Sequence, residues 1–139
     1  MLTVIEGAPG AGKTTYVKQN ATPGDVIIDM DRIASALWIP TTTESHAYPD
    51  TVRTIAREAR NQAVKTAIQI HQSMTRTNVW IIHADPSQEM RRKYRSVSAR
   101  FVHLDPGMDV CIDRVRDRNP TMARNIIPFI REYYAQRGV

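Results

Sequence analysis

The chain has 139 residues, of which 42% are hydrophobic and 24% are charged, and its formal net charge at pH 7 is +5. This length and composition predict one globular domain over 1–139, too short for AAA-type motors, helicases and most GTPases. The lone cysteine, Cys111, excludes an intrachain disulfide, and the apolar runs are too short for a membrane span. The chain begins at once with an apolar run and not with a leader pattern, so we expect a cytoplasmic protein without membrane or disulfide-linked partners.

The first half of the chain alternates short apolar runs with helical patterns. A strand is predicted at Leu2–Ile5, followed by a glycine-rich segment, Gly7–Thr14, and a helix over Lys13–Asn20. A second strand, Val26–Ile28, leads into a helix over Asp31–Trp38. The strands show little alternation of apolar and polar residues, which is typical of parallel strands covered on both faces.

The second half continues this alternation. Thr51–Ser73 is predicted as the longest helix because apolar residues recur there at helical spacing. These residues are Val52, Ile55, Ala56, Ala59, Ala63, Ala67 and Ile70. Strands are predicted at Val79–His83 and Phe101–Leu104. The pairs Asp85-Pro86 and Asp105-Pro106 follow them, and an aspartate before a proline predicts a capped helix start.

The order β-α-β-α-α-β-α-β-α-α predicts an α/β fold, with a doubly wound, mainly parallel sheet of four to five strands and helices on both faces. Ligands of such folds bind at the carboxyl ends of the strands. The residues that follow each predicted strand are therefore the first candidates for chemistry.

The segment after the first strand is a complete phosphate-binding loop with the spacing G-x-x-x-x-G-K-T. Its glycines let backbone N–H groups curl around a phosphate, and the next helix turns the positive end of its dipole to that anion. The expected nucleotide-binding residues are Gly7, Ala8, Pro9, Gly10, Ala11, Gly12, Lys13, Thr14 and Thr15. In this motif the lysine reaches the β- and γ-phosphates and the threonine hydroxyl ligates Mg²⁺. Lys13 and Thr14 therefore predict binding of ATP, or another nucleoside triphosphate, with Mg²⁺.

Two carboxylates follow the second strand at the same predicted edge of the sheet. Asp29 is nearer to the strand, and Asp31 opens the next helix. A kinase needs a carboxylate here to orient the acceptor hydroxyl and take its proton. The alternative for Asp31 is a helix cap without a catalytic role. Arg32 beside it is a candidate for binding a substrate phosphate, or points to solvent.

Arginines in the last third of the chain are candidates for a lid over the γ-phosphate. They are Arg114, Arg116, Arg118 and Arg124. Phosphoryl transfer needs cations where charge shifts between oxygens, and a closing lid supplies them. Arg118, which abuts the break at Asn119-Pro120, and Arg124 are the leading catalytic choices. The interleaved Asp113 and Asp117 leave open a salt-bridged surface helix instead.

Three further features each have two interpretations. Asp85 is either a second Mg²⁺ ligand after the third strand or the cap of the next helix. The basic run 91–95 either follows a nucleic-acid backbone or forms a solvated helix face. The segment Ile39–Pro49, with His46 and Tyr48, is a loop that could line a substrate pocket.

With the phosphate loop, the strand-end acids and the arginine-bearing region together, the chain resembles the small P-loop kinases, and within them the phage polynucleotide kinase group. That group includes phage enzymes that phosphorylate 5-hydroxymethylpyrimidine bases, such as 5-hydroxymethyluracil, in DNA. The resemblance implies that Asp31 activates the acceptor hydroxyl and that the lid arginine lies within Arg116–Arg124. The family's phosphate-binding arginine, three residues after the aspartate, is here Ala34, so Arg32 or Arg53 would replace it.

Together these observations predict a Mg²⁺-ATP-dependent kinase that transfers the γ-phosphate to a hydroxyl on nucleic acid. The acceptor is either a hydroxymethyl group on a DNA base or a 5′-OH end, and both stay open. A base would have to leave the stack, and the Ile39–Tyr48 loop would line its pocket. The alternatives are a kinase for a nucleoside, nucleotide or sugar and, less favoured, an NTP-dependent switch. A phage origin would place the protein in the host cytoplasm.

Overall fold

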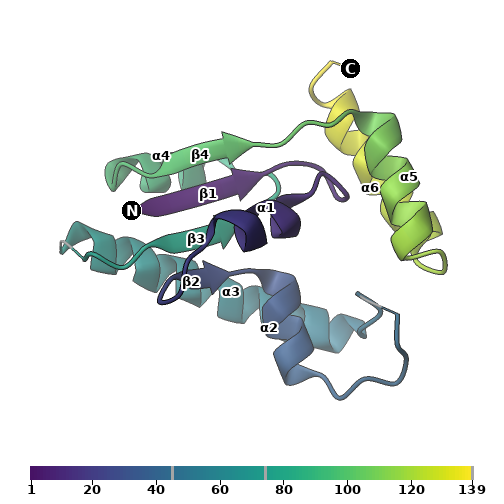
Figure 1. Ribbon diagram of the computed structural model, residues 1–139, viewed down its shortest axis with the longest axis horizontal. Helices are drawn as coiled ribbons and strands as arrows, with labels where there is room; N and C mark the ends of the chain where they lie inside the picture. Colours follow the sequence, from purple (N-terminus) through teal and green to yellow (C-terminus); the bar gives the residue numbers. More distant parts are fainter. Residues whose placement is uncertain (45, 74, 139) are drawn as a thin grey trace.

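The computed structural model describes residues 1–44, 46–73 and 75–138, and its elements follow the predicted order (Figure 1). The strands are β1 (Leu2–Glu6), β2 (Val26–Ile28), β3 (Val79–Ile82) and β4 (Arg100–His103). The helices are α1 (Lys13–Asn20), α2 (Met30–Leu37), α3 (Asp50–Gln72), α4 (Gln88–Ser96), α5 (Met108–Arg118) and α6 (Ala123–Ala135). The single-domain α/β fold predicted from the sequence is confirmed. None of the helices in these described ranges is long and apolar enough to cross a bilayer.

The strands form one 4-stranded sheet in the order β2-β3-β1-β4. β1 is central, and its Val4 pairs with Ile81 of β3 on one side and with Phe101 of β4 on the other. Every pairing is parallel, so the carboxyl ends of the strands meet at one edge of the sheet. The phosphate-binding loop and Asp29 both begin at this edge, which is why they lie in one region.

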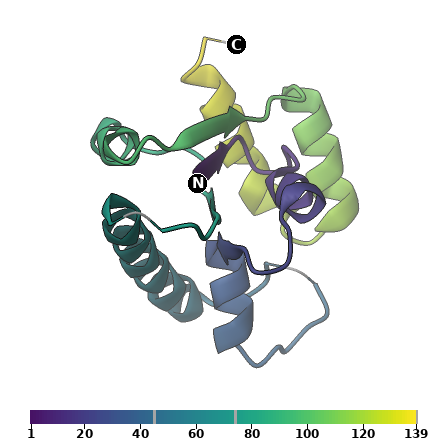
Figure 2. The same ribbon diagram turned by 60° about the vertical axis from the view of Figure 1, so that its left-hand side comes forward.

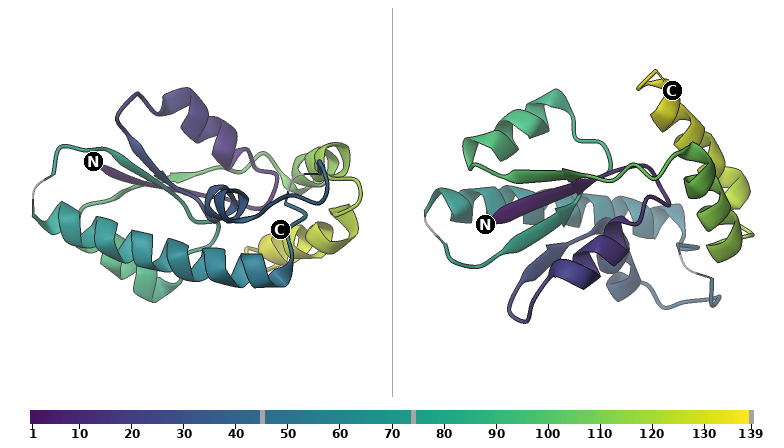
Figure 3. Two further views of the ribbon diagram at one scale, coloured as in Figure 1. Left: turned by 90° about the horizontal axis from the view of Figure 1, so that it is seen from below. Right: turned by 45° about the horizontal axis from the view of Figure 1, so that its top comes forward.

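Helices cover both faces of the sheet, as predicted. On one face, Val64 of α3 and Tyr94 of α4 belong to the same buried cluster as Val4 and Ile81. On the other face, Val17 of α1 packs against the sheet, and Figure 3 shows the sheet between α1 and α3. The α5–α6 pair lies beyond the carboxyl ends of β1 and β4 and has a buried cluster of its own (Figures 1 and 2).

The buried face of α3 differs from the predicted one. Its buried residues are Ala56, Val64, Ala67 and Ile68. Ile55 and Ile70, expected inside, are instead 52% and 50% exposed. The first half of α3 packs against α2 and Tyr48, whereas the second half packs against the sheet. At about 100° per residue the four buried residues fall within about 120° of one another around the helix, and Ile55 and Ile70 lie outside this stripe.

The prediction that the Asp-Pro pairs cap helices is wrong. α4 begins after Ser87, whose hydroxyl accepts the N–H of Met90 at 3.2 Å, and α5 begins after Gly107. Asp105 accepts the hydroxyl of Tyr134 at 2.7 Å, and Asp85 pairs with arginines. Each chain segment needs a longer turn between strand and helix than the prediction allowed, and each carboxylate binds a distant side chain.

Candidate active site

The phosphate-binding loop connects β1 to the N-terminus of α1. The N-cap of α1 is Gly12, at φ 93°, and no side chain of the described residues caps the helix. The N–H groups of the first turn are therefore available to an anion. The Lys13 ammonium donates to the carbonyl oxygens of Gly7 and Ala8, each at 2.8 Å, so it lies over the loop.

The charge of Lys13 depends on its surroundings. Burial lowers the pKa of Lys13 from its ordinary value to about 8. The negative charges of Asp31 and Asp29 oppose this shift, and the positive charge of Arg118 adds to it. These four side chains therefore act on one another within a single site.

We expect ATP affinity to weaken above about pH 8, because a triphosphate binds the ammonium form of Lys13 and binding to the neutral form requires proton uptake. The apparent Kd should rise toward about 10-fold per pH unit beyond that point. Calorimetric titration with a non-hydrolysable ATP analogue between about pH 7.5 and 9.5 measures this dependence. Lys13→Met is the control and should show no break near pH 8. A wild-type profile without a break would contradict the lowered pKa.

Gly10 allows the loop to lie against α5. Its φ is +81°, and an added Cβ would stand 2.7 Å from the carbonyl oxygen of Cys111. Gly10→Ala should therefore lower the free energy of unfolding by about 2–4 kcal/mol, from backbone strain and the clash together. Gly24→Ala is the matched control, because φ is also positive (+96°) but nothing lies within 4 Å. It should cost only about 1–2 kcal/mol. Urea unfolding compares the two variants, and equal losses would contradict the close packing.

A cavity of about 490 Å³ lies beside the phosphate-binding loop at the carboxyl edge of the sheet. Its wall includes Thr14 from α1, and Asp29 and Asp31 from the junction of β2 and α2. The remaining wall comes from α2 and the segment 38–49: Arg32, Ser35, Trp38, Pro40, Thr42, Thr43, Glu44, His46 and Tyr48. The volume is in the range of small-molecule pockets. A hydroxyl compound bound here would lie between the loop and the carboxylates.

Asp31 lies in the first turn of α2, and one of its carboxylate oxygens has two partners. The Tyr48 hydroxyl donates to Oδ1, and His46 Nδ1 lies 3.1 Å from the same atom. Burial tends to raise the pKa of Asp31, but the contacts with His46 and Tyr48 outweigh it and hold that pKa below its ordinary value. The carboxylate is therefore ionised at neutral pH. Within the part of the chain that the structure describes, both side-chain contacts fall on Oδ1, which leaves Oδ2 to accept a proton from an acceptor hydroxyl.

Asp29 is the cap of α2, a role that the sequence offered for Asp31. Its Oδ1 accepts the backbone N–H of Asp31 at 3.4 Å. Burial, together with the negative charge of Asp31, raises the pKa of Asp29. Asp29 also shares the cavity wall with Thr14, the expected Mg²⁺ ligand. A hydroxyl and a nearby carboxylate fit Mg²⁺, which prefers oxygen ligands and keeps several waters.

The loop residues His46 and Tyr48, expected at the substrate site, lie on the cavity wall. Tyr48 is 5% exposed, and its ring meets Trp38 edge-on with the centroids 6.2 Å apart. His46 has a φ of 63°, which is uncommon outside glycine, and this backbone conformation accompanies its contact with Asp31. Aromatic rings therefore lie on the cavity wall directly beside the Asp31 carboxylate.

The structure separates the two arginines expected to replace the family's phosphate-binding arginine. Arg32 lies on the cavity wall. Arg53 lies outside it, with its guanidinium 5.2 Å above the Tyr48 ring. Ala34 itself is fully buried against Tyr48 and Ala56, so a side chain as large as arginine would not fit there. Arg32 is therefore the better placed of the two for a substrate phosphate.

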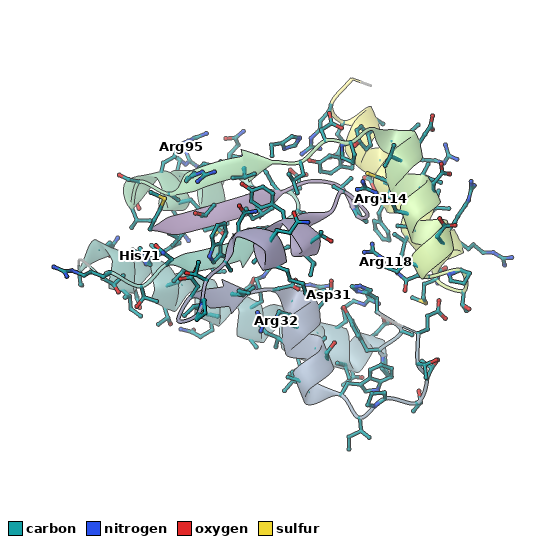
Figure 4. The ribbon with its side chains drawn as sticks, viewed as in Figure 1. Asp31, Arg32, His71, Arg95, Arg114 and Arg118 are labelled. Carbon is teal, nitrogen blue, oxygen red and sulfur yellow. The ribbon has the colours of Figure 1, made fainter. Side chains whose placement is uncertain are left out.

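Arginines of α5 lie across the phosphate-binding loop from Asp31. Arg114 Nη1 donates to the carbonyl oxygen of Gly10 at 3.2 Å. Arg118, at the end of α5, is near enough to Lys13 to affect its pKa. Figure 4 shows Arg114 and Arg118 on the side of α5 that is turned toward Asp31. The region expected to carry the lid thus places at least two cations beside the loop.

A protein-family model described as an AAA domain matches residues 2–126. The chain belongs to this AAA-domain family. The family includes P-loop kinases, so the match supports nucleotide binding and a kinase-like phosphotransferase, without selecting the acceptor. No curated protein matches the chain at a significant level. A chain of 139 residues is too short for an AAA-type motor, but this length is compatible with the kinases of the family.

Of the residues expected at the site of this AAA-domain protein, Asp85, Arg124 and Arg118, like Arg53, are not on the cavity wall. Asp85 pairs with Arg137 at 2.9 Å and with Arg91 at 4.0 Å, so the structure does not bring it together with Thr14. Arg124 is exposed in the first turn of α6 and does not line the cavity. The narrower resemblance to phage polynucleotide kinases stays a prediction.

Sequence reasoning underrated Arg114 and overlooked Glu44. The i,i+4 spacing of Arg114 and Arg118 placed both on one helix face, and that signal could have raised Arg114 to a leading choice. Glu44 lies on the cavity wall and contacts the turn between α5 and α6. No local pattern in the sequence indicates that contact.

Proposed function

We propose that this protein is a Mg²⁺-ATP-dependent kinase that transfers the γ-phosphate to a hydroxyl on DNA, with a hydroxymethyl group on a base as the first candidate acceptor. One observation carries the proposal: ionised Asp31, whose Oδ1 is held by Tyr48 and His46, shares a cavity with Thr14 of the phosphate-binding loop. This is the arrangement that brings a general base and a triphosphate to one acceptor.

Each residue then has a definite task. Lys13 and the loop N–H groups hold the phosphates, and Thr14, with Asp29 nearby, would hold Mg²⁺, which offsets charge on the β- and γ-phosphate oxygens. Asp31 Oδ2 takes the hydroxyl proton while the acceptor oxygen forms its bond to the γ-phosphorus. The bond from that phosphorus to the β–γ bridging oxygen breaks, and ADP leaves. Arg118 supports the charge that shifts between these oxygens.

The cavity wall supports a base as the acceptor. Trp38 and Tyr48 provide aromatic surface, and the hydroxyls of Ser35, Thr42 and Thr43 provide hydrogen-bonding groups. A base taken out of the stack is recognised by such a combination of stacking and hydrogen bonds. The formal net charge of +5 favours a polyanionic substrate.

The position of Ala34 also bears on the choice of acceptor. Its full burial leaves no room for the arginine that binds the neighbouring phosphate in the kinases of 5′ ends that the chain resembles. This weakens recognition of a 5′-OH end, which is the second candidate. A small-molecule kinase is the remaining alternative, favoured by the cavity volume of about 490 Å³.

The test compares transfer of label from γ-labelled ATP to three acceptors at low salt with Mg²⁺. They are a duplex containing 5-hydroxymethyluracil with blocked 5′ ends, an ordinary duplex with free 5′-hydroxyls, and free nucleosides. Label in the first alone would support the proposal in full. Label in the second or third alone would move the acceptor to a DNA end or a small molecule. Label in none would contradict the kinase assignment.

A further inference from the structure

Glu44 joins the loop at 38–49 to the turn between α5 and α6. Its Oε1 accepts the backbone N–H of Thr121 at 3.1 Å and that of Met122 at 3.3 Å. Met122 is the N-cap of α6 and provides no side-chain cap of its own. The Met122 N–H also donates to the carbonyl oxygen of Asn119 at 3.1 Å, so Glu44 shares it, and a carboxylate beside a helix N-terminus interacts favourably with the helix dipole. Glu44 therefore holds the start of α6 through the N-cap Met122 and through Thr121, which is 77 residues away in the sequence.

This contact connects the two halves of the candidate site. On the loop side, Glu44 is followed closely by His46 and Tyr48, both of which contact Asp31. On the lid side, Thr121 and Met122 lie in the chain between Arg118 and Arg124. Figure 3 shows the loop reaching the end of the α5–α6 pair. A displacement of the loop would therefore move the anchoring point of the turn between these arginines.

We propose that Glu44 is a positioning residue that couples the acceptor pocket to the lid. The inference rests on the proposed kinase function of the same cavity. An acceptor in the cavity contacts the loop, which in turn holds the N-terminus of α6 and keeps Arg118 beside the phosphate-binding loop. Such coupling is reciprocal, so a lid in place also strengthens acceptor binding. Its effect is to favour transfer to the acceptor over transfer to water.

The first measurement is hydrogen exchange of the backbone amides, which does not require the protein to transfer phosphate. In Glu44→Ala, the backbone amides of 119–126 should exchange hydrogen about 10-fold faster than in the wild type, because two charge-assisted hydrogen bonds are lost. Glu44→Gln keeps an acceptor oxygen, so its exchange rates at 119–126 should lie between those of the wild type and those of Glu44→Ala. Glu58→Ala removes the same charge from an exposed position on α3 and should match the wild type. An oligonucleotide containing 5-hydroxymethyluracil should slow exchange at 119–126 in the wild type but not in Glu44→Ala.

The second readout is kinetic. Glu44→Ala should raise the acceptor KM and lower kcat, together reducing kcat/KM by about 10-fold or more, while the Kd for ATP is unchanged. Glu44→Gln should recover part of this loss, and a general structural defect would weaken ATP binding as well. Unchanged exchange at 119–126, or faster exchange with wild-type kcat and acceptor KM, would overturn the coupling. Absence of transfer by the wild-type protein would instead contradict the proposed function.

Discussion

Replacing Asp31 with asparagine should lower the rate of phosphate transfer by about 10²–10⁴-fold, the usual contribution of a general base. The amide oxygen can still accept hydrogen bonds from Tyr48 and His46, but the amide nitrogen in place of Oδ2 cannot take a proton. The loop that holds the phosphates is untouched, so the Kd for ATP should change little. Single-turnover transfer to the best acceptor measures the effect.

The matched control for this variant is Asp50→Asn. Asp50 is fully exposed at the start of α3, and its contact is a 3.8 Å ion pair with Arg53. The same chemical change there should leave the transfer rate within a factor of about 2. Wild-type transfer by Asp31→Asn, or an equal loss in both variants, would contradict the assignment of Asp31 as the base.

Replacing Lys13 with methionine should weaken ATP binding and lower transfer, with a combined loss in kcat/KM of about 10²-fold or more. Methionine removes the cost of burying the charge but also the hydrogen bonds to the carbonyl oxygens of Gly7 and Ala8, so the free energy of unfolding should change little. Calorimetric ATP titration and thermal unfolding test the two expectations separately. Lys18→Met, in the last turn of the same helix, is the control and should bind ATP normally. A Lys13→Met protein with wild-type affinity would remove Lys13 from the nucleotide site.

The phosphate-binding loop could be predicted because its chemistry depends on backbone geometry within a few consecutive residues. The same holds for β1 and β3, whose apolar runs need only burial on both faces to become central strands of a parallel sheet. The meeting of Asp29 with Thr14 follows from that topology, since both come after strands at one edge. The motif and the strand order were therefore enough to predict that the phosphate-binding loop and Asp29 lie at the same edge of the sheet.

The contacts that arrange the site could not be predicted, because they join residues far apart in the chain. Tyr48 reaches Asp31 from a loop without periodicity, and Glu44 binds the N–H of Thr121, 77 residues further along the chain. The aspartate of each Asp-Pro pair was assigned to the nearest helix for the same reason. Its true partner, such as Tyr134 for Asp105, lies on a different element.

The packing of Gly10 sets a limit on how the α5–α6 pair can move. The near part of α5 is fixed to the phosphate-binding loop, through Cys111 behind Gly10 and through Arg114 on its carbonyl oxygen. At the same end of the pair, the Tyr134 hydroxyl is 3.7 Å from Cys111 Sγ and donates to Asp105 after β4. The pair is therefore fixed to the phosphate-binding loop and the sheet where α5 begins and α6 ends, and the turn at its opposite end is held by the contact with Glu44. Arg118 lies next to this turn, so its position depends on a contact made by a distant loop, whereas Arg114 is held directly by the carbonyl oxygen of Gly10.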